Sequence, residues 1–254
     1  MKWYIYNNII FEVFIVKIYF LMIWYGLYMI LEFFRGGVIF FLKKFSSKET
    51  VDRYVKEKYI AWARFSMNIL NHKIESKGVE NIPEGPCVFV MNHQSLFDIP
   101  TLVLNADRLI GFIAKKELLK VPILGLWLRA VHSVPIDRSN IREAINVINK
   151  GVENLHEGYS MAIFPEGTRA KDGKLKGFKK GSLKLATKAN VPIVPVTIDG
   201  SYKGYEEKKK FMGANIKIIF DEPIYPDKLS KEEQRDLAEI IHDKIEENLK
   251  KMRS

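Results

Sequence analysis

The chain has 254 residues, enough for one large α/β domain or for a smaller domain with an appendage. It carries 40 Lys and Arg against 30 Asp and Glu, a net charge of +10, so its surface attracts anions: nucleic acid, acidic proteins, phosphorylated small molecules or an anionic membrane face. The single cysteine, Cys87, excludes a disulfide framework and indicates that most of the chain lies in a reducing compartment.

Residues 1–44 predict a membrane-embedded helical anchor, because this part of the chain is strongly apolar and aromatic. The uncharged run from Ile18 to Leu31 would cover roughly 21 Å as a helix, which is less than the roughly 30 Å hydrocarbon core of a bilayer. We therefore expect one or two helices embedded in one leaflet, with a tilted single span as the alternative. Lys43 and Lys44 follow the apolar stretch, which favours the cytoplasmic face of the membrane.

The rest of the chain predicts a connecting amphipathic helix over 45–72 and an α/β domain over 73–254. In that domain apolar strand-like runs alternate with helical patterns, which predicts a largely parallel central sheet of about six or seven strands flanked by helices. Pro192 and Pro195 suggest that one strand is an edge strand or starts irregularly. The expected strands cover residues 72–76, 86–91, 108–114, 131–136, 161–164, 191–198 and 214–220, and the expected helices include 99–104, 139–156, 178–189 and a C-terminal helix opened by a capping box at 230–233.

A polar stretch, residues 92–98, joins the expected strand 86–91 to the helix that follows. Open α/β sheets bind ligands at such carboxyl ends of strands. His93 can exchange a proton near neutral pH, and Asp98 is close enough in sequence to orient the imidazole and stabilise its protonated form. The same pattern also fits a simple helix entry, with Ser95 as N-cap and Asp98 in the first turn.

A second polar stretch, Pro165 to Arg169, follows the expected strand 161–164. The planar guanidinium of Arg169 is suited to holding a phosphate group. Glu166 could orient Arg169 or hydrogen-bond a ligand, and the sequence leaves both roles open. These residues therefore predict an anion-binding counterpart to the His93 stretch.

Four blocks stand in one order over residues 87–200: the stretch 92–98, the segment from Lys115 to Arg138, the stretch 164–169 and the segment 191–196. Together they resemble the glycerophospholipid acyltransferase family, and most closely its 1-acylglycerol-3-phosphate acyltransferases, which make phosphatidic acid from lysophosphatidic acid. The resemblance implies that His93 and Asp98 are the catalytic pair. It also implies that the glycerol phosphate of the acceptor is bound by Lys115, Arg138, Glu166, Gly167, Thr168 and Arg169. Lys116, beside Lys115, keeps the register of that lysine open.

The reaction implied is direct transfer of an acyl chain from acyl-CoA or an acyl carrier protein to the sn-2 hydroxyl of lysophosphatidic acid, without an acyl-enzyme, a metal or another cofactor. The acceptor could also be another lysophospholipid or glycerol 3-phosphate. The expected partners are the lipid acceptor, the acyl donor and membrane lipid, with no nucleic acid. Lysines over 171–188 either form a solvated face or bind an acidic carrier protein or the phosphates of coenzyme A.

Two other classes of function use the same residues differently. A metal-dependent phosphohydrolase with His93 and Asp98 as ligands would need further His, Asp or Glu residues at ligand spacing, and the sequence offers no such cluster. A membrane-tethered nucleic-acid binder would need aromatic residues between the basic ones, which the basic stretches lack. The acyltransferase interpretation is therefore preferred.

Overall fold

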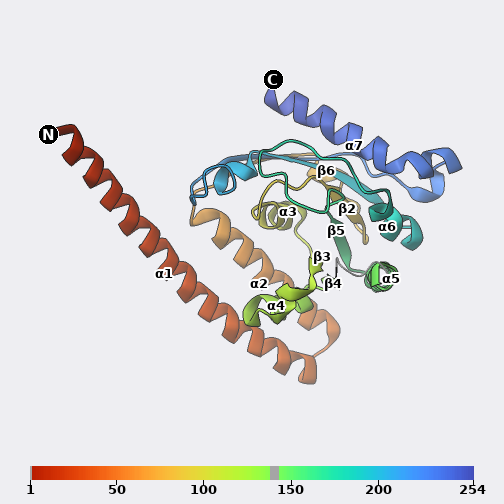
Figure 1. Cartoon of the computed structure of the whole chain (residues 1–254). Coiled ribbons are helices and arrows are strands. Elements are labelled where there is room, and N and C mark those ends of the chain that lie inside the picture. Colours follow the sequence, from red (N-terminus) through yellow and green to blue (C-terminus); the bar gives the residue numbers. More distant parts are fainter. Residues whose placement is uncertain (1, 138–142) are drawn as a thin grey trace.

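The computed structural model of the chain describes residues 2–137 and 143–254. The chain begins with one long helix, α1 (Lys2–Phe45), which turns back into α2 (Lys48–Asn68). Figure 1 shows α2 between α1 and the sheet, while the N-terminal part of α1 extends beyond the rest of the protein. The helix continues through Gly36 and Gly37 without a break, so the N-terminal segment forms a single helix.

The helix α1 exposes one apolar face and packs on the domain with the other. Its segment Tyr19–Phe45 is the one part of the described chain whose length and composition would allow it to be embedded in a membrane. At about 1.5 Å per residue the whole helix is about 66 Å long, well over the thickness of a bilayer core. Its inner face packs on the protein: the Tyr28 ring stacks on Phe65 of α2 at 3.9 Å, and Trp127 Nε1 donates to the Glu32 carbonyl at 3.2 Å. Part of the apolar helix is thus fixed to the domain.

The domain is built on a seven-stranded sheet with the order β1-β7-β6-β2-β5-β3-β4. All neighbouring strands are parallel except β6 and β7. The predicted largely parallel α/β sheet is therefore confirmed. The strands are β1 (Lys73–Lys77), β2 (Val88–Met91), β3 (Ile110–Lys115), β4 (Val134–Ile136), β5 (Ser160–Ile163), β6 (Ile193–Asp199) and β7 (Asn215–Phe220).

Helices cover both faces of this sheet (Figure 1). Alternate residues of β2 belong to the two cores: Phe89 and Met91 pack with α2, α3 and α4, whereas Val88 and Val90 pack with α5, α6 and α7. This alternation is what a strand buried on both sides requires. The helices are α3 (Asp98–Ala106), α4 (Pro122–Ala130), α5 (Glu143–His156), α6 (Lys184–Ala189) and α7 (Lys231–Arg253).

The strand β6 is central, so the expectation of an edge strand was wrong. Pro195 pairs in register with Val90 of β2, and its carbonyl accepts from Asp221 N at 3.0 Å on the other side. The donor that proline lacks would face Asp221, which lies just past the end of β7. The proline is tolerated because it lies just past the regular β6–β7 register, where its carbonyl still pairs and only its missing N–H is lost.

Two helix predictions have different outcomes. The helix expected over 178–189 is shorter, because a 3₁₀ turn (Lys180–Leu183) precedes α6. The capping box that opens α7 is confirmed: Ser230 Oγ accepts from Glu233 N at 3.2 Å, and Ser230 N donates to the Glu233 carboxylate at 2.8 Å.

Candidate active site

The turn from β2 to α3 is held by its neighbouring strand. Asn92 Nδ2 donates to the Ile198 carbonyl, and Ile198 N donates to Asn92 Oδ1, both at 2.8 Å. The buried Asn92 side chain thus mimics a backbone neighbour and fixes the carboxyl end of β2 against β6. The residue that follows, His93, is placed at the edge of the sheet where the carboxyl ends of β2, β5 and β6 meet.

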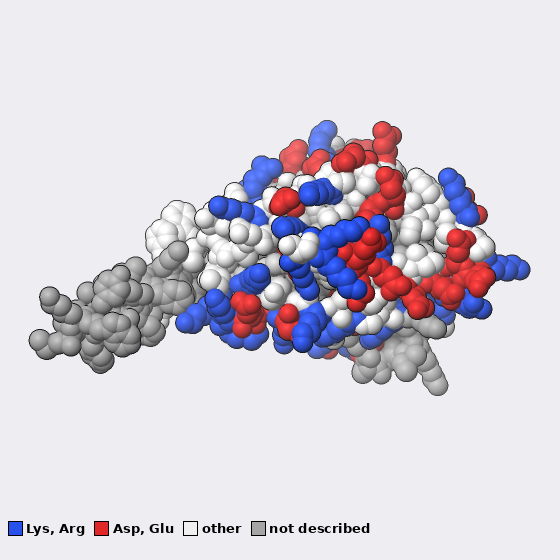
Figure 2. All heavy atoms as spheres, turned by 90° about the horizontal axis from the view of Figure 1, so that it is seen from above, with Lys and Arg blue, Asp and Glu red and all other residues white. Residues whose placement is uncertain are grey.

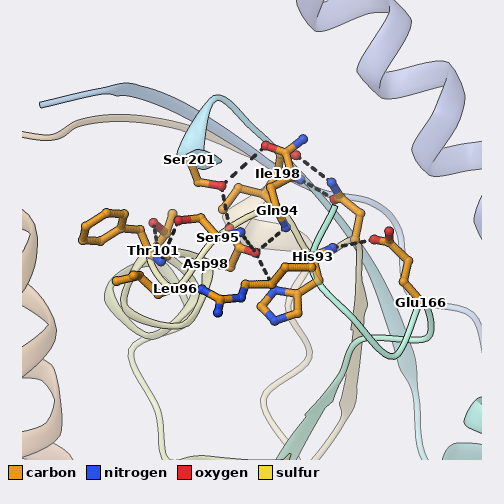
Figure 3. Close-up of polar contacts among 12 residues, drawn as sticks. His93, Gln94, Ser95, Leu96, Asp98, Thr101, Glu166, Ile198 and Ser201 are labelled. Atoms are coloured by element: carbon orange, nitrogen blue, oxygen red, sulfur yellow. Dashed lines mark hydrogen bonds and ion pairs between the residues drawn. The ribbon is translucent and has the colours of Figure 1, made fainter. Parts of the chain in front are cut away.

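His93 and Asp98 form a close pair, with 2.7 Å between Nδ1 and Oδ2 (Figure 3). The imidazole also stacks on Phe164, with ring centroids 3.8 Å apart. The His93 side chain is 18% exposed, and among the described residues its Nε2 has no hydrogen-bond partner. The ring is therefore fixed on one side and accessible on the other.

Asp98 is fully buried and its carboxylate is held by several donors. Gln94 N and Ser95 N donate to Oδ2 at 2.7 and 2.9 Å, and the Ser201 hydroxyl donates to Oδ1 at 2.6 Å (Figure 3). Asp98 does open α3, as the helix-entry interpretation expected, but the N-cap residue is Phe97 and not Ser95. The same carboxylate therefore binds the amides of the turn and the imidazole, so its ionised form is well satisfied.

Glu166, in the loop after β5, supports the His93 turn. Its carboxylate accepts from His93 N at 2.6 Å (Figure 3) and from Lys176 N at 3.2 Å. Burial raises the pKa of Glu166, while these backbone donors oppose the shift. The sequence left two roles open for Glu166: orienting Arg169 or hydrogen-bonding a ligand. In the structure its carboxylate instead binds the backbone amide of His93.

Arg169 is oriented by a residue that the sequence did not indicate. Its Nη1 lies 2.6 Å from Oε1 of Glu206, and the Glu206 side chain is 2% exposed. Glu206 also accepts from the Ser95 hydroxyl at 2.6 Å and from Leu96 N at 3.1 Å. In the sequence Glu206 reads as part of a charged loop, because no local pattern marks it as buried.

The remaining expected ligands are placed differently. Gly167 has a φ of 73°, which favours glycine, and Thr168 beside it is exposed. Lys115 ends β3, where its ammonium lies 3.7 Å from the Glu117 carboxylate and is largely exposed. Arg138 lies outside the described residues. Of the six expected ligands, Glu166 and Arg169 are thus tied to the His93 turn, through the His93 amide and through Glu206.

Acidic and basic side chains are interspersed on the face of the molecule seen in Figure 2. Among the residues that the structure describes, no group of three or more His, Cys, Asp or Glu side chains is arranged to hold a metal ion.

An oriented imidazole at the carboxyl edge of a parallel sheet, with an arginine held beside its turn, has the geometry of an acid–base site. The sequence model of the acyltransferase family matches residues 73–199, which contain the whole network around His93 except Ser201 and Glu206. The chain belongs to the acyltransferase family.

Individual relatives agree with this. The chain is 35% identical over 202 residues to a chloroplastic 1-acyl-sn-glycerol-3-phosphate acyltransferase of Brassica napus, covering 75% of this chain and 58% of the relative. It is 32% identical over 191 residues to a 1-acyl-sn-glycerol-3-phosphate acyltransferase of Borreliella burgdorferi, covering 74% and 76%. The crystal structure of the 1-acyl-sn-glycerophosphate (LPA) acyltransferase PlsC from Thermotoga maritima superimposes with a TM-score of 0.77 at 30% identity, covering 92% of this chain and 96% of that one. The chain spans only 52% of an Arabidopsis thaliana relative, so several of these proteins are considerably longer.

Proposed function

We propose that this protein transfers an acyl chain from an acyl thioester to the sn-2 hydroxyl of 1-acylglycerol 3-phosphate and so forms phosphatidic acid. The observation that carries the proposal is the 2.7 Å contact between His93 Nδ1 and Asp98, with Nε2 left accessible. The names of the relatives support lysophosphatidic acid as the acceptor.

In this reaction His93 acts as the general base. Its Nε2 takes the proton of the sn-2 hydroxyl while the hydroxyl oxygen bonds to the thioester carbonyl carbon. The carbon–sulfur bond then breaks, and the leaving thiolate takes the proton from the imidazolium. Asp98 keeps the Nδ1–H in place and stabilises the charge that develops on the ring.

Direct transfer is favoured because the nearby nucleophiles are engaged or buried. The Ser95 hydroxyl donates its proton to Glu206 at 2.6 Å, so it is not aligned to lose that proton to His93. Cys87 is fully buried, and burial raises the pKa of its thiol to about 11. Neither side chain is suited to forming an acyl-enzyme.

Arg169 is the best-placed residue for the phosphate of the acceptor, because its guanidinium is fixed beside the His93 turn. Arg138 and Lys115 are proposed as additional cations of the same subsite. Glu166 acts on the base through the His93 amide. Another lysophospholipid or glycerol 3-phosphate as acceptor is the alternative, and the acyl donor is acyl-CoA or an acyl carrier protein.

The apolar part of α1 would hold the enzyme on the cytoplasmic face of a membrane, where a lysophospholipid is available. Large apolar side chains cover its outer surface: Phe34 is 66% exposed and Phe40 is 77% exposed. Lys43 and Lys44 follow in the last turn, which suits an anionic membrane surface.

The test is an acyl-transfer assay with the full chain in lipid vesicles, an acyl thioester and a panel of lysophospholipids and glycerol 3-phosphate. We expect lysophosphatidic acid to be consumed, activity to persist in excess chelator, and His93→Ala to lose at least about 10³-fold in kcat. Near-normal turnover by His93→Ala would refute the mechanism. Preference for a different acceptor would refute the substrate.

A further inference from the structure

The loop that contains Glu166 and Arg169 is bound to a lysine-bearing segment. Lys179 N donates to the Pro165 carbonyl at 3.0 Å, and Lys176 Nζ donates to the Arg169 carbonyl at 3.0 Å. Both lysines therefore lie on the loop, although neither belongs to the four sequence blocks. Their side chains are exposed, so solvent and ligands can reach them.

The ammonium of Lys179 lies directly against Gly167. A Cβ atom at position 167 would come within 2.8 Å of Lys179 Nζ and 3.1 Å of Cε. The backbone of Lys179 is also fixed on its carboxyl side, because Ser182 N and Oγ donate to its carbonyl at 2.9 and 2.6 Å. The bare backbone of Gly167 thus leaves room for this ammonium on the loop.

The charge balance of the site calls for such a cation. A phosphate monoester carries a charge near −2 at neutral pH, whereas Arg169 is already paired with the buried Glu206. The pair is neutral overall, so binding a phosphate there calls for a further cation. Within the described part of the chain, the Lys179 ammonium forms no ion pair, and the Lys176 ammonium is engaged by the Arg169 carbonyl.

We propose that Lys179 binds the phosphate of the acceptor together with Arg169, at a position that Gly167 keeps open. This inference rests on the proposed function. A lysine supplies a compact point charge with three rotatable donors, which complements the rigid fork of an arginine. Lys179 would act in acceptor binding and not in proton transfer, since the base is His93.

The test compares Lys179→Met and Lys179→Gln with Lys179→Arg in the full chain in vesicles. Lys188→Met is the matched control, because that lysine donates to Asn149 at 2.6 Å, on the face covered by α5 and α6. We expect the two neutral variants to raise KM for lysophosphatidic acid by about tenfold or more with little change in kcat. Lys179→Arg should recover most of the loss, and Lys188→Met should behave as wild type.

Turnover of the phosphate-free acceptor 1-acylglycerol separates binding from folding. We expect the neutral variants and the wild type to use this acceptor equally poorly. An unchanged KM for lysophosphatidic acid, or an equal loss with both acceptors, would overturn the role of Lys179. Failure of the proposed function itself would instead appear as a wild-type protein that does not consume lysophosphatidic acid.

Discussion

The carboxylate of Glu206 joins Arg169 to the turn that carries His93: it lies 2.6 Å from the guanidinium and accepts hydrogen bonds from Ser95 and Leu96. The position of the arginine is therefore coupled to the turn that carries His93. A buried carboxylate with a cationic partner and two further donors is well satisfied, whereas the loss of one partner leaves an uncompensated charge. In the proposed mechanism the acceptor subsite and the base thus share one support.

Replacing Glu206 should weaken acceptor binding more than it slows proton transfer. In Glu206→Gln one side-chain oxygen can still accept from the turn, but the charge that holds Arg169 is lost. We expect kcat/KM for lysophosphatidic acid to fall about 10- to 100-fold, mainly through KM, with a loss of about 1–3 kcal/mol in stability. Steady-state kinetics and urea unfolding measure the two effects.

The neighbouring Glu207 provides the control for this experiment, since its side chain is exposed. Glu207→Gln should match the wild type in both measurements. A Glu206→Gln enzyme with unchanged kcat/KM would show that Arg169 does not depend on this carboxylate.

The donors around Asp98 predict a graded series of catalytic defects. In Asp98→Asn an NH₂ group replaces one carboxylate oxygen, so the donors that faced this oxygen lose their acceptor. The side chain also no longer stabilises the imidazolium, so we expect kcat to fall about 10³- to 10⁴-fold. Ser201→Ala removes the 2.6 Å hydrogen bond to Oδ1 and a long 3.5 Å contact with Gln94 Oε1, and Asp98 keeps its contacts with His93 and the turn amides. That variant should lose about tenfold or less.

The order of these two variants is the decisive result, and pre-steady-state rates of acyl transfer would establish it. Equal losses would mean that Ser201 does more than support the carboxylate. A larger loss for Ser201→Ala than for Asp98→Asn would argue for a direct role of the hydroxyl in the reaction.

The sequence indicated contacts between residues that are close along the chain, but not contacts between distant residues. His93 and Asp98 are five residues apart and Ser230 and Glu233 three, so short-range spacing was enough to indicate both pairs. Glu206 and Ser95 are separated by 111 residues, and the contact exists because the segment after β6 returns to the end of β2. No periodicity along the chain encodes such an encounter.

The wrong expectation of an edge position for β6 has a similar cause. Pro195 excludes one ladder hydrogen bond, which usually indicates an edge. Its compatibility with a central strand depends on where β7 ends, and this is a property of a partner strand and not of β6 itself. The pattern of the apolar runs predicted that strands exist, whereas their neighbours were decided by tertiary packing.

His72 should make stability depend on pH. It is buried, its Nδ1 accepts from Ala214 N at 3.1 Å, and burial lowers its pKa to about 4. Above pH 6.5 the imidazole is neutral in both the folded and the unfolded chain. Between pH 6.5 and about 4 the unfolded chain binds a proton that the folded chain does not, so stability falls as the pH falls.

The size of this effect is up to about 3 kcal/mol over the full window. In His72→Gln the amide oxygen can still accept from Ala214 N and does not titrate, so this contribution should disappear. Urea unfolding at several pH values between 7 and 4.5 compares the two slopes. Parallel slopes for the wild type and His72→Gln would assign the pH dependence to other groups.

The attachment of α1 to the domain can be tested with two adjacent glycines. A Cβ atom at Gly36 would lie 2.7 Å from Leu126 Cδ2, whereas one at Gly37 would meet nothing within 4 Å. Both substitutions remove a glycine from a helix, which by itself is stabilising. Gly36→Leu should nevertheless lose about 1–3 kcal/mol, because its side chain must displace Leu126 at the contact between α1 and α4.

Gly37→Leu should therefore be neutral or stabilising, and the difference in sign between neighbouring positions is the prediction. Thermal unfolding in detergent, together with the rate of proteolysis at the turn between α1 and α2, measures it. Equal behaviour of the two variants would mean that the contact with Leu126 does not stabilise the position of α1. Because Trp127 also donates to the Glu32 carbonyl one turn earlier, we expect the contact to contribute to folding even without lipid.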